Sequence, residues 1–222
     1  MFASIAPRYD AANDLLSMGV HQSWRRAAVE AASLKPGERV LDCATGTGDL
    51  ALALARAVGP TGEVIATDFC APMLKPAPAK ARKAGLGNIT FSVADALALP
   101  FPDGHFDAAT IAFGIRNVDD PVRCLREMAR VVKPRGRVVV LEFGQPRGAF
   151  GALFKLYSRS VMPLVGGLVT GNRAAYEYLP RTAAAFPSGA QFLSLMDDSK
   201  SFQSRTARSL TFGTAFVYRG VK

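Results

Sequence analysis

Short apolar runs alternate with segments of helical periodicity through the middle of the chain. Between the runs, apolar residues recur every three or four positions, as they do along an amphipathic helix. The run Val138-Val139-Val140-Leu141 is apolar throughout, which is typical of a parallel strand covered on both faces. The runs of strand length are residues 39–43, 63–67, 89–93, 108–113 and 138–141. Strands that alternate with helices predict an α/β fold, Rossmann-like and doubly wound, with a mostly parallel sheet.

Proline and aspartate residues set the expected ends of two helices in this unit. A helix is predicted over residues 72–84, but it contains Pro76 and Pro78. Each proline removes a backbone hydrogen bond, so we expect this helix to be short or kinked. A later helix should begin after Asp120, a favourable N-cap residue, with Pro121 at its first position.

Helical regions and a late strand flank the alternating core. Residues 210–219 have the pattern of a strand, and we expect it to pair antiparallel with roughly residues 202–208. The length of 222 residues fits one domain of ordinary size and is too short for two full ones. We therefore predict a single domain with a helical cap, a ligand-binding core, a helical lid and C-terminal strands, over residues 1–38, 39–146, 147–200 and 201–222.

The loop after the first strand has the chemistry of a nucleoside-binding turn. Gly46 and Gly48 allow a tight turn and let a ligand approach the backbone N–H groups where the next helix begins. Asp68 ends the second strand, where a carboxylate can accept hydrogen bonds from both hydroxyls of a ribose. This pattern also fits a dinucleotide, so by itself it does not separate NAD from other nucleosides.

Further carboxylates favour a nucleoside that carries a positive charge. Asp42 lies inside the first strand and would place a negative charge beside a cationic ligand, whereas Asp49 at the helix start would oppose a pyrophosphate. Asp95 follows the third strand, where an adenine amino group needs an acceptor. Each of these alone is more often a capping or loop carboxylate. At neighbouring strand ends, where ligands bind in open sheets, Asp42, Asp68 and Asp95 together indicate S-adenosylmethionine.

Several motifs along the chain point to one family. The turn Gly46-Thr47-Gly48-Asp49 is common to many methyltransferases, whereas the Tyr9-Asp10 opening and the run Phe113-Gly114-Ile115-Arg116-Asn117-Val118 are much more specific. Further motifs are Ala98-Leu99-Pro100-Phe101-Pro102-Asp103, Val132-Lys133-Pro134, Leu141-Glu142-Phe143 and Tyr176-x-Tyr178-Leu179. With these motifs the chain resembles the ubiquinone/menaquinone biosynthesis C-methyltransferases, a family of class I S-adenosylmethionine-dependent enzymes.

The resemblance implies a seven-stranded sheet with helices on both faces and a C-terminal antiparallel hairpin. It also implies S-adenosyl-L-methionine as cofactor, bound or shaped by Asp42, Gly46, Thr47, Gly48, Asp68, Phe69, Asp95, Ala96 and Ala112. Ala112 stands where some relatives carry a serine. Ala44 and Thr45 also depart from the family pattern, and both fit only if the backbone there has a negative φ.

The same resemblance implies methylation of a ring carbon in a prenylated quinol, first of all demethylmenaquinol. The carbon becomes nucleophilic when a neighbouring hydroxyl ionises, and a phenol has an ordinary pKa of about 10, so the site must favour the phenolate. We expect Arg116 to stabilise the phenolate, Asn117 to orient the ring and Tyr9 to complete the polar contacts. The alternative for Arg116 is an ion pair with Asp119 or Asp120.

Histidine and cysteine content argue against two further kinds of site. The two histidines, His21 and His105, cannot build a histidine-rich metal site, so no metal is expected. His21 would suit a base, but we expect it to cap or pack the N-terminal helices. Three cysteines stand far apart, which argues against a disulfide framework and favours the cytoplasm. Residues 1–10 lack the apolar segment of a secretory signal.

Charge is uneven along the chain, and the basic end suggests a surface for lipid. The net charge is +9, and residues 145–222 hold 10 basic and 3 acidic side chains. Residues 150–169 are apolar with Lys155 and Arg159 interspersed, which suits a lid on an anionic membrane at the inner face of the plasma membrane. Ordinary packing over the sheet is the alternative. No uncharged run approaches the ~20 residues of a spanning helix.

Three other functions remain open on the sequence. A methyltransferase could act on another lipophilic acceptor, such as a 2-polyprenyl-methoxy-benzoquinol, a sterol or a phospholipid amine. An NAD(P)-dependent oxidoreductase would share the glycine turn, but Asp42 inside the strand argues against it. A nucleic-acid-binding module could use the basic third, but no aromatic and basic stacking pattern supports one, so no nucleic-acid partner is expected. A homodimer through the C-terminal helices is compatible with the sequence.

Overall fold

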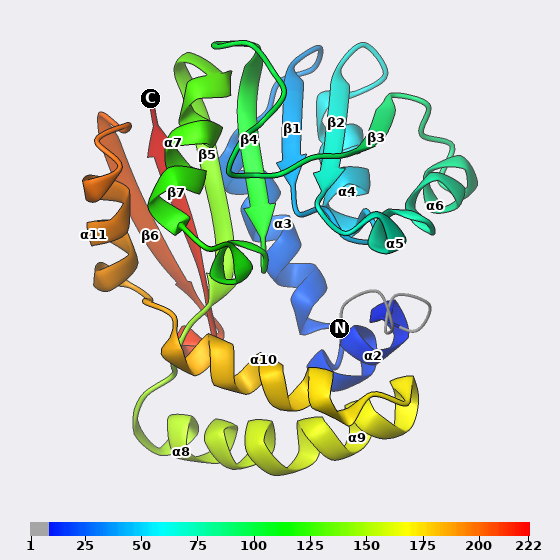
Figure 1. The fold of residues 1–222 in the computed structure, drawn as a ribbon, viewed down its shortest axis with the longest axis vertical. Coiled ribbons are helices and arrows are strands. Elements are labelled where there is room, and N and C mark those ends of the chain that lie inside the picture. The colour runs from blue at the N-terminus through cyan, green and yellow to red at the C-terminus, as the bar shows by residue number, and fades with distance from the viewer. Residues whose placement is uncertain (1–8) are drawn as a thin grey trace.

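The structure, a computed structural model, describes the backbone of residues 9–222 (Figure 1). It describes the side chains of residues 10–168, 171–172, 174, 176 and 178–222. The predicted site residue Tyr9 begins a helix, but its side chain lies outside the described residues.

Seven strands form one mixed sheet in the order β3-β2-β1-β4-β5-β7-β6. The first five strands along the chain are parallel, and β7 pairs antiparallel with both β5 and β6. The strands are β1 (Arg39–Cys43), β2 (Glu63–Asp68), β3 (Ile89–Val93), β4 (Phe106–Ala112), β5 (Val132–Phe143), β6 (Ser204–Leu210) and β7 (Ala215–Val221). The predicted seven-stranded sheet with a C-terminal antiparallel hairpin is confirmed.

Helices cover both faces of the sheet, because the central strands are apolar on both sides. On one face, α3 (Val20–Ala32) and α4 (Asp49–Val58) pack over Val40, Val64 and Ala108. On the other face, α7 (Pro121–Val131) and α11 (Ala190–Asp198) pack over strand residues such as Leu41 and Val140. Alternate residues of one strand therefore enter two different hydrophobic clusters, as the doubly wound arrangement requires.

The helix ends follow the local chemistry of the sequence. The segment predicted as one kinked helix is broken into α5 (Ala71–Leu74) and α6 (Ala77–Lys83), with Pro76 between them. The carboxylate of Asp120 accepts a hydrogen bond from the backbone N–H of Arg123 at 2.9 Å, so it caps α7 as expected.

The C-terminal hairpin is present, but the predicted position of its last strand is wrong. The strand expected over residues 210–219 is β7, which begins only at Ala215. Leu210 ends β6, and the short helix η4 (Thr211–Gly213) forms the connection. Residues 211–213 all have positive φ values, so the backbone reverses there and cannot pair as a strand.

A separate group of helices lies beyond the carboxyl ends of the parallel strands. Figure 1 shows α2, α8, α9 and α10 gathered at the bottom of the view, with α3 rising from this group along the sheet. Ala12 and Leu16 of α2 cluster with Tyr176 of α10. The helices are α2 (Tyr9–Ser17), α8 (Gly148–Leu156), the π-helix η3 (Tyr157–Val161), α9 (Met162–Thr170) and α10 (Arg173–Ala185). Among the described residues, no helix is both long and apolar enough to cross a membrane.

Candidate active site

The turn between β1 and α4 is anchored from below by a buried carboxylate. Asp42 is completely buried in β1, and it accepts hydrogen bonds from the hydroxyls of Thr45 and Thr110, each at 2.6 Å. Burial raises the pKa of Asp42 to about 6, and the nearby charge of Asp68 acts in the same direction. Asp42 therefore lies beneath the turn, and both of its carboxylate oxygens accept hydrogen bonds from threonine side chains of the protein.

The backbone of this turn is left-handed at three positions. Gly46 and Gly48 have φ values of 57° and 88°, as the glycine pattern predicts. Ala44 has a φ of 49°, so the expectation of a negative φ there is wrong, whereas Thr45 is not among the residues with positive φ. A left-handed alanine costs about 1–2 kcal/mol. Gly114 gives Ala44 room, because a Cβ on Gly114 would lie 2.5 Å from the Ala44 Cβ.

Asp68 holds the same turn from the next strand. Its Oδ2 accepts a hydrogen bond from the Gly46 N–H at 2.8 Å, and its Oδ1 accepts one from the Cys70 N–H at 2.8 Å. Burial raises the pKa of Asp68 in spite of these two bonds. Each carboxylate oxygen is thus fixed in place and keeps a second lone pair for a ligand.

Four more of the predicted cofactor residues lie at neighbouring strand ends. Phe69, directly after Asp68, is 77% exposed and offers an open aromatic face. Asp95 follows β3, is exposed, and accepts a hydrogen bond from the Leu97 N–H at 2.8 Å. The half-buried Ala96 is next to it, and Ala112 ends β4.

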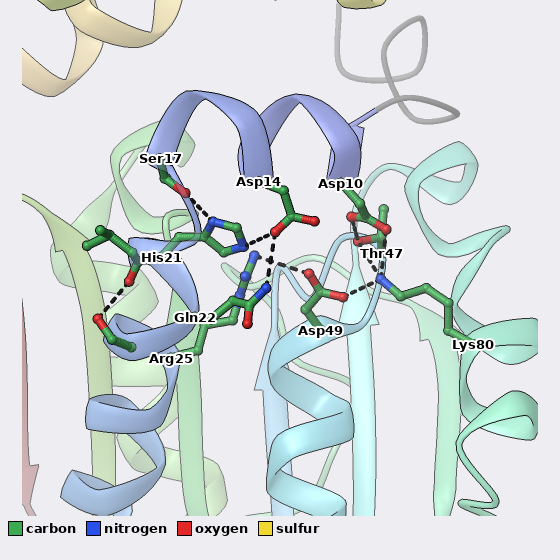
Figure 2. A network of polar contacts seen from close by, with 11 residues as sticks. Asp10, Asp14, Ser17, His21, Gln22, Arg25, Thr47, Asp49 and Lys80 are labelled. Carbon is green, nitrogen blue, oxygen red and sulfur yellow. Dashed lines mark hydrogen bonds and ion pairs between the residues drawn. The ribbon is translucent and has the colours of Figure 1, made fainter.

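A network of charges joins this turn to the N-terminal helices (Figure 2). The hydroxyl of Thr47 donates to Oδ1 of Asp10 at 2.6 Å, and Nζ of Lys80 donates to Oδ2 of the same carboxylate at 2.8 Å. Asp49 pairs with both Lys80 and Arg25. Helix α2 is therefore fastened to the turn, and Asp49, which we expected to repel a pyrophosphate, is held between two cations.

An aromatic cavity of about 440 Å³ lies next to this network, between the N-terminal helices and the helices α8–α10. The rings of Phe113 and Phe143 lie 4.5 Å apart, and Trp24 is about 6 Å from each. The polar residues in its wall include Asn13, Ser17, His21, Arg25, Arg116, Tyr157, Tyr176 and Tyr178. No Asp or Glu is among the described residues that line this cavity.

Arg116 brings a buried positive charge to the cavity wall. Its guanidinium forms an ion pair with Glu142 at 2.9 Å, and the two side chains are only 4% and 1% exposed. The predicted alternative, a pair with Asp119 or Asp120, is wrong, because the helical turn η2 (Ile115–Asn117) aims Arg116 at β5. Nη1 also donates to the Phe113 carbonyl. Nε is buried and has no hydrogen-bond partner within the described part of the chain.

Asn117 lies on the same helical turn and contacts the lid. Its Nδ2 donates to the Phe113 carbonyl at 3.4 Å, and its Oδ1 accepts from the Tyr178 hydroxyl at 3.2 Å. The side chain thus connects η2 to α10.

Asp14, Ser17 and His21 were not predicted as site residues from the sequence, although they lie in or beside the cavity wall. His21 packs between α2 and α3 as expected, but it also lines the cavity. Its Nδ1 is hydrogen-bonded to Ser17, and its Nε2 lies 3.2 Å from Oδ1 of Asp14. The spacing Asp14, Ser17, His21 was visible in the sequence, but only the fold turns these side chains toward one another.

Comparisons with known proteins agree with this geometry. The chain matches the model of the ubiE/COQ5 methyltransferase family over residues 1–222. The chain belongs to this family.

A ubiquinone/menaquinone biosynthesis C-methyltransferase UbiE from Bdellovibrio bacteriovorus is 51% identical over 221 residues, which cover 99% of this chain and 93% of that protein. A demethylmenaquinone methyltransferase from Thermus thermophilus is also 51% identical, and 99% of each chain is covered.

Solved structures of lower identity confirm the fold. A SAM-dependent methyltransferase from Thermotoga maritima has a TM-score of 0.68 at 21% identity, over 100% of this chain and 97% of that one. One from Aquifex aeolicus has a TM-score of 0.63 at 21% identity, over 89% of this chain and 88% of that one.

The family establishes S-adenosyl-L-methionine as the methyl donor, and the residues at the sheet edge fit it. Asp68 offers two fixed acceptors for a diol, Phe69 offers an open face for a base, and Asp95 offers an acceptor for an amino group. The carboxylates Asp68 and Asp95 also suit a cationic ligand. These residues would hold the donor beside the aromatic cavity.

The raised pKa of Asp42 predicts a stability difference that depends on pH. With a pKa of about 6 in the folded state and 3.8 as its ordinary value, Asp42 binds more protons in the folded chain between these values. The wild type should therefore lose stability relative to Asp42→Asn as pH rises from 4 to 7, by about 2–3 kcal/mol. Urea unfolding at several pH values measures the difference, with the exposed Asp119→Asn as control. Parallel curves for wild type and Asp42→Asn would contradict the assignment.

Proposed function

We propose that the protein transfers a methyl group to a ring carbon of a prenylated quinol, first of all demethylmenaquinol. The observation that carries this proposal is the guanidinium of Arg116 among the residues that line an aromatic cavity, with a buried Nε that has no hydrogen-bond partner in the described part of the chain. The names of the relatives, UbiE and demethylmenaquinone methyltransferase, support the same substrate class.

The charge of the cavity favours an acceptor that becomes anionic. Arg25 and Arg116 both line it, and no carboxylate does so among the described residues. A phospholipid amine would develop positive charge on methylation and would need a carboxylate near its nitrogen. A quinol needs the opposite, because its ring carbon reacts when a neighbouring oxygen is ionised. A benzoquinol with the same hydroxyl pattern stays the nearest alternative substrate.

Arg116 has the position and the free donor to stabilise the ionised oxygen. Glu142 and the Phe113 carbonyl hold Nη1, which fixes the plane of the guanidinium. The guanidinium carbon also lies 5.1 Å from the centre of the Phe143 ring. Nε therefore presents its N–H in a set direction, and a donor fixed before the reaction stabilises the developing charge without reorganisation.

The remaining residues place the ring. S-adenosyl-L-methionine supplies an electrophilic methyl group when it is bound. Phe113 and Phe143 form a tilted aromatic pair against which a flat naphthol ring can pack. Asn117 orients the ring from η2, and its hydrogen bond to Tyr178 keeps the lid helix α10 in contact with the site. The expected role of Tyr9 as a further polar contact stays a prediction.

Replacing Arg116 tests this role, provided that the buried charge of Glu142 is removed with it. Arg116→Met alone would strand a buried carboxylate, which costs roughly 3–5 kcal/mol. The double variant Arg116→Met/Glu142→Gln avoids this and should bind S-adenosyl-L-methionine as the wild type does. Its kcat with demethylmenaquinol should fall by a factor of about 10²–10³, the usual cost of losing one such donor.

Glu142→Gln alone is the matched control, because its amide oxygen can still accept from Nη1 of Arg116 and the cost of losing the Glu142 charge is common to both variants. Turnover is followed by the mass gained by the quinol, and donor affinity by calorimetry. Equal kcat values for the single and the double variant would remove Arg116 from the mechanism.

The lid also supports contact with a membrane, from which a prenylated substrate would come. A second cavity of about 880 Å³ lies between β5 and the helices α8–α10, and Phe143, Phe154, Met162 and Leu179 line both cavities. The second cavity could hold the start of the prenyl tail. Several apolar side chains of the lid are exposed, including Leu153, Leu156, Val161, Leu164 and Leu168.

Basic residues stand among these exposed apolar side chains. Lys155 and Arg159 line the second cavity, and neither forms an ion pair with a described side chain. Apolar and basic residues together suit the inner, anionic face of the plasma membrane. We infer that the helices α8–α9 rest on this surface. A homodimer through the C-terminal helices stays a prediction.

Removing the two basic residues should weaken binding to anionic vesicles. Each contributes about 1 kcal/mol near such a surface, so Lys155→Ala/Arg159→Ala should bind roughly 30-fold more weakly than the wild type at low salt. The control is Lys75→Ala/Lys83→Ala, which removes the same charge from two exposed positions, one directly after α5 and one at the end of α6. Co-sedimentation with vesicles containing phosphatidylserine measures binding. Absence of wild-type binding at low salt, or equal losses in both variants, would contradict the proposal.

A further inference from the structure

Polar contacts join Ser17 to His21 and His21 to Asp14 (Figure 2). Helix α2 ends at Ser17, the chain turns through Met18 and Gly19 with positive φ values, and α3 begins at Val20. This tight turn sets the His21 ring against α2, where Nδ1 is hydrogen-bonded to the Ser17 hydroxyl and Nε2 lies 3.2 Å from Asp14. Ser17 and His21 both line the cavity.

Ser17 is half-buried where it lines the cavity, His21 is buried, and only Asp14 at the outer end is exposed. The side chain of His21 is 8% exposed, whereas that of Asp14 is 55% exposed. A proton that reaches the imidazole can therefore continue to a carboxylate in contact with water, although the cavity itself is mostly apolar.

The protonation state of His21 suits an acceptor. We assign the ring proton to Nε2 because that atom faces a carboxylate, and Nδ1 then accepts from the Ser17 O–H. Burial lowers the pKa of His21, and the positive charge of Arg25 lowers it further, whereas Asp14, Asp49 and a hydrogen bond with the Asn13 backbone raise it. The net effect is a pKa below the ordinary value of 6.5, so the ring is neutral at pH 7.

The other polar groups of the described lining are poor proton acceptors. A guanidinium stays protonated in proteins, so Arg25 and Arg116 cannot accept a proton. The Tyr157 hydroxyl donates to the Leu16 carbonyl at 2.6 Å, and burial raises the pKa of Tyr157. His21 is the one imidazole in this wall.

We propose that Ser17 and His21 take up the proton of the quinol hydroxyl and pass it to solvent beside Asp14. The proposal rests on the proposed function and adds the proton acceptor to it. The quinol O–H bond breaks as its proton moves to Ser17 Oγ, and the Ser17 O–H proton moves to Nδ1 of His21. The imidazolium then gives its Nε2 proton to Asp14 or to water. The ring oxygen keeps the electron pair and faces the Arg116 donor.

The protons of the whole reaction balance. Methylation replaces one ring C–H bond by a C–CH₃ bond and leaves the methyl donor without its positive charge, so one proton is released in total. After the methyl group has arrived, the ring carbon loses its proton to water and the ring oxygen regains one through the same residues. Ser17 touches the substrate in this scheme, and His21 acts through Ser17.

The pH profile of kcat/KM separates this role from simple packing. In the wild type, kcat/KM should fall on the acid side as His21 becomes protonated, at a pH below 6.5. His21→Gln and Ser17→Ala should lose this acid limb, and at pH 7 their kcat/KM should be lower by a factor of about 10²–10⁴. Ser23→Ala is the matched control, because Ser23 is exposed on the same helix and bonds only the Val20 carbonyl.

A more acidic substrate gives a second readout. A demethylmenaquinol analogue with an electron-withdrawing group, whose hydroxyl is ionised at pH 7, needs no proton acceptor. With it, both variants should come within a few-fold of the wild type. Calorimetry with S-adenosyl-L-methionine should give wild-type affinity for all variants, which shows that the fold is intact.

The outcomes distinguish the two proposals. If the wild type methylates demethylmenaquinol but the variants keep the acid limb, or lose as much activity on the acidic analogue, Ser17 and His21 have a structural role and the relay is overturned. If the wild type methylates no quinol, the proposed function is overturned and the relay with it.

Discussion

Two buried or half-buried carboxylates hold the turn after β1, and every part of the site depends on that turn. Asp42 fixes it from below through Thr45, and Asp68 fixes it from the side through the Gly46 N–H. Both carboxyl groups have raised pKa values because they lose contact with water. The turn therefore keeps its shape at a cost in electrostatic free energy, which indicates that the shape serves binding and not stability.

Different charged groups stand on the two sides of the fixed turn. Asp68 and Asp95 are at the strand ends where we propose that the cationic donor binds, and Arg25 and Arg116, each ion-paired with a carboxylate, line the aromatic cavity that we propose for the quinol ring. The ion pairs of Lys80 and Arg25 with Asp10 and Asp49 lie between these regions. They tie the N-terminal helices to the turn, so the wall that carries His21 is held in a fixed position relative to the donor's edge.

The sequence was sufficient for the parallel part of the sheet. Apolar periodicity located the parallel strands, prolines located the break between α5 and α6, and the glycine pattern located the left-handed turn after β1. Contacts between distant segments were not predictable in the same way. The pairing of Arg116 with Glu142 depends on the register of β5, and the left-handed Ala44 depends on space left by Gly114. The array of Ser17, His21 and Asp14 depends on the sharp turn between α2 and α3.

The most direct test of this arrangement is a crystal structure with S-adenosylhomocysteine and a naphthoquinol analogue. The ribose hydroxyls should bind Asp68, the adenine should lie against Phe69 with its amino group toward Asp95, and the sulfur should face the ring. The ring should pack near Phe113 and Phe143, with an oxygen on the Arg116 Nε–H. A nucleoside bound away from Asp68, or a ring outside this cavity, would contradict the account.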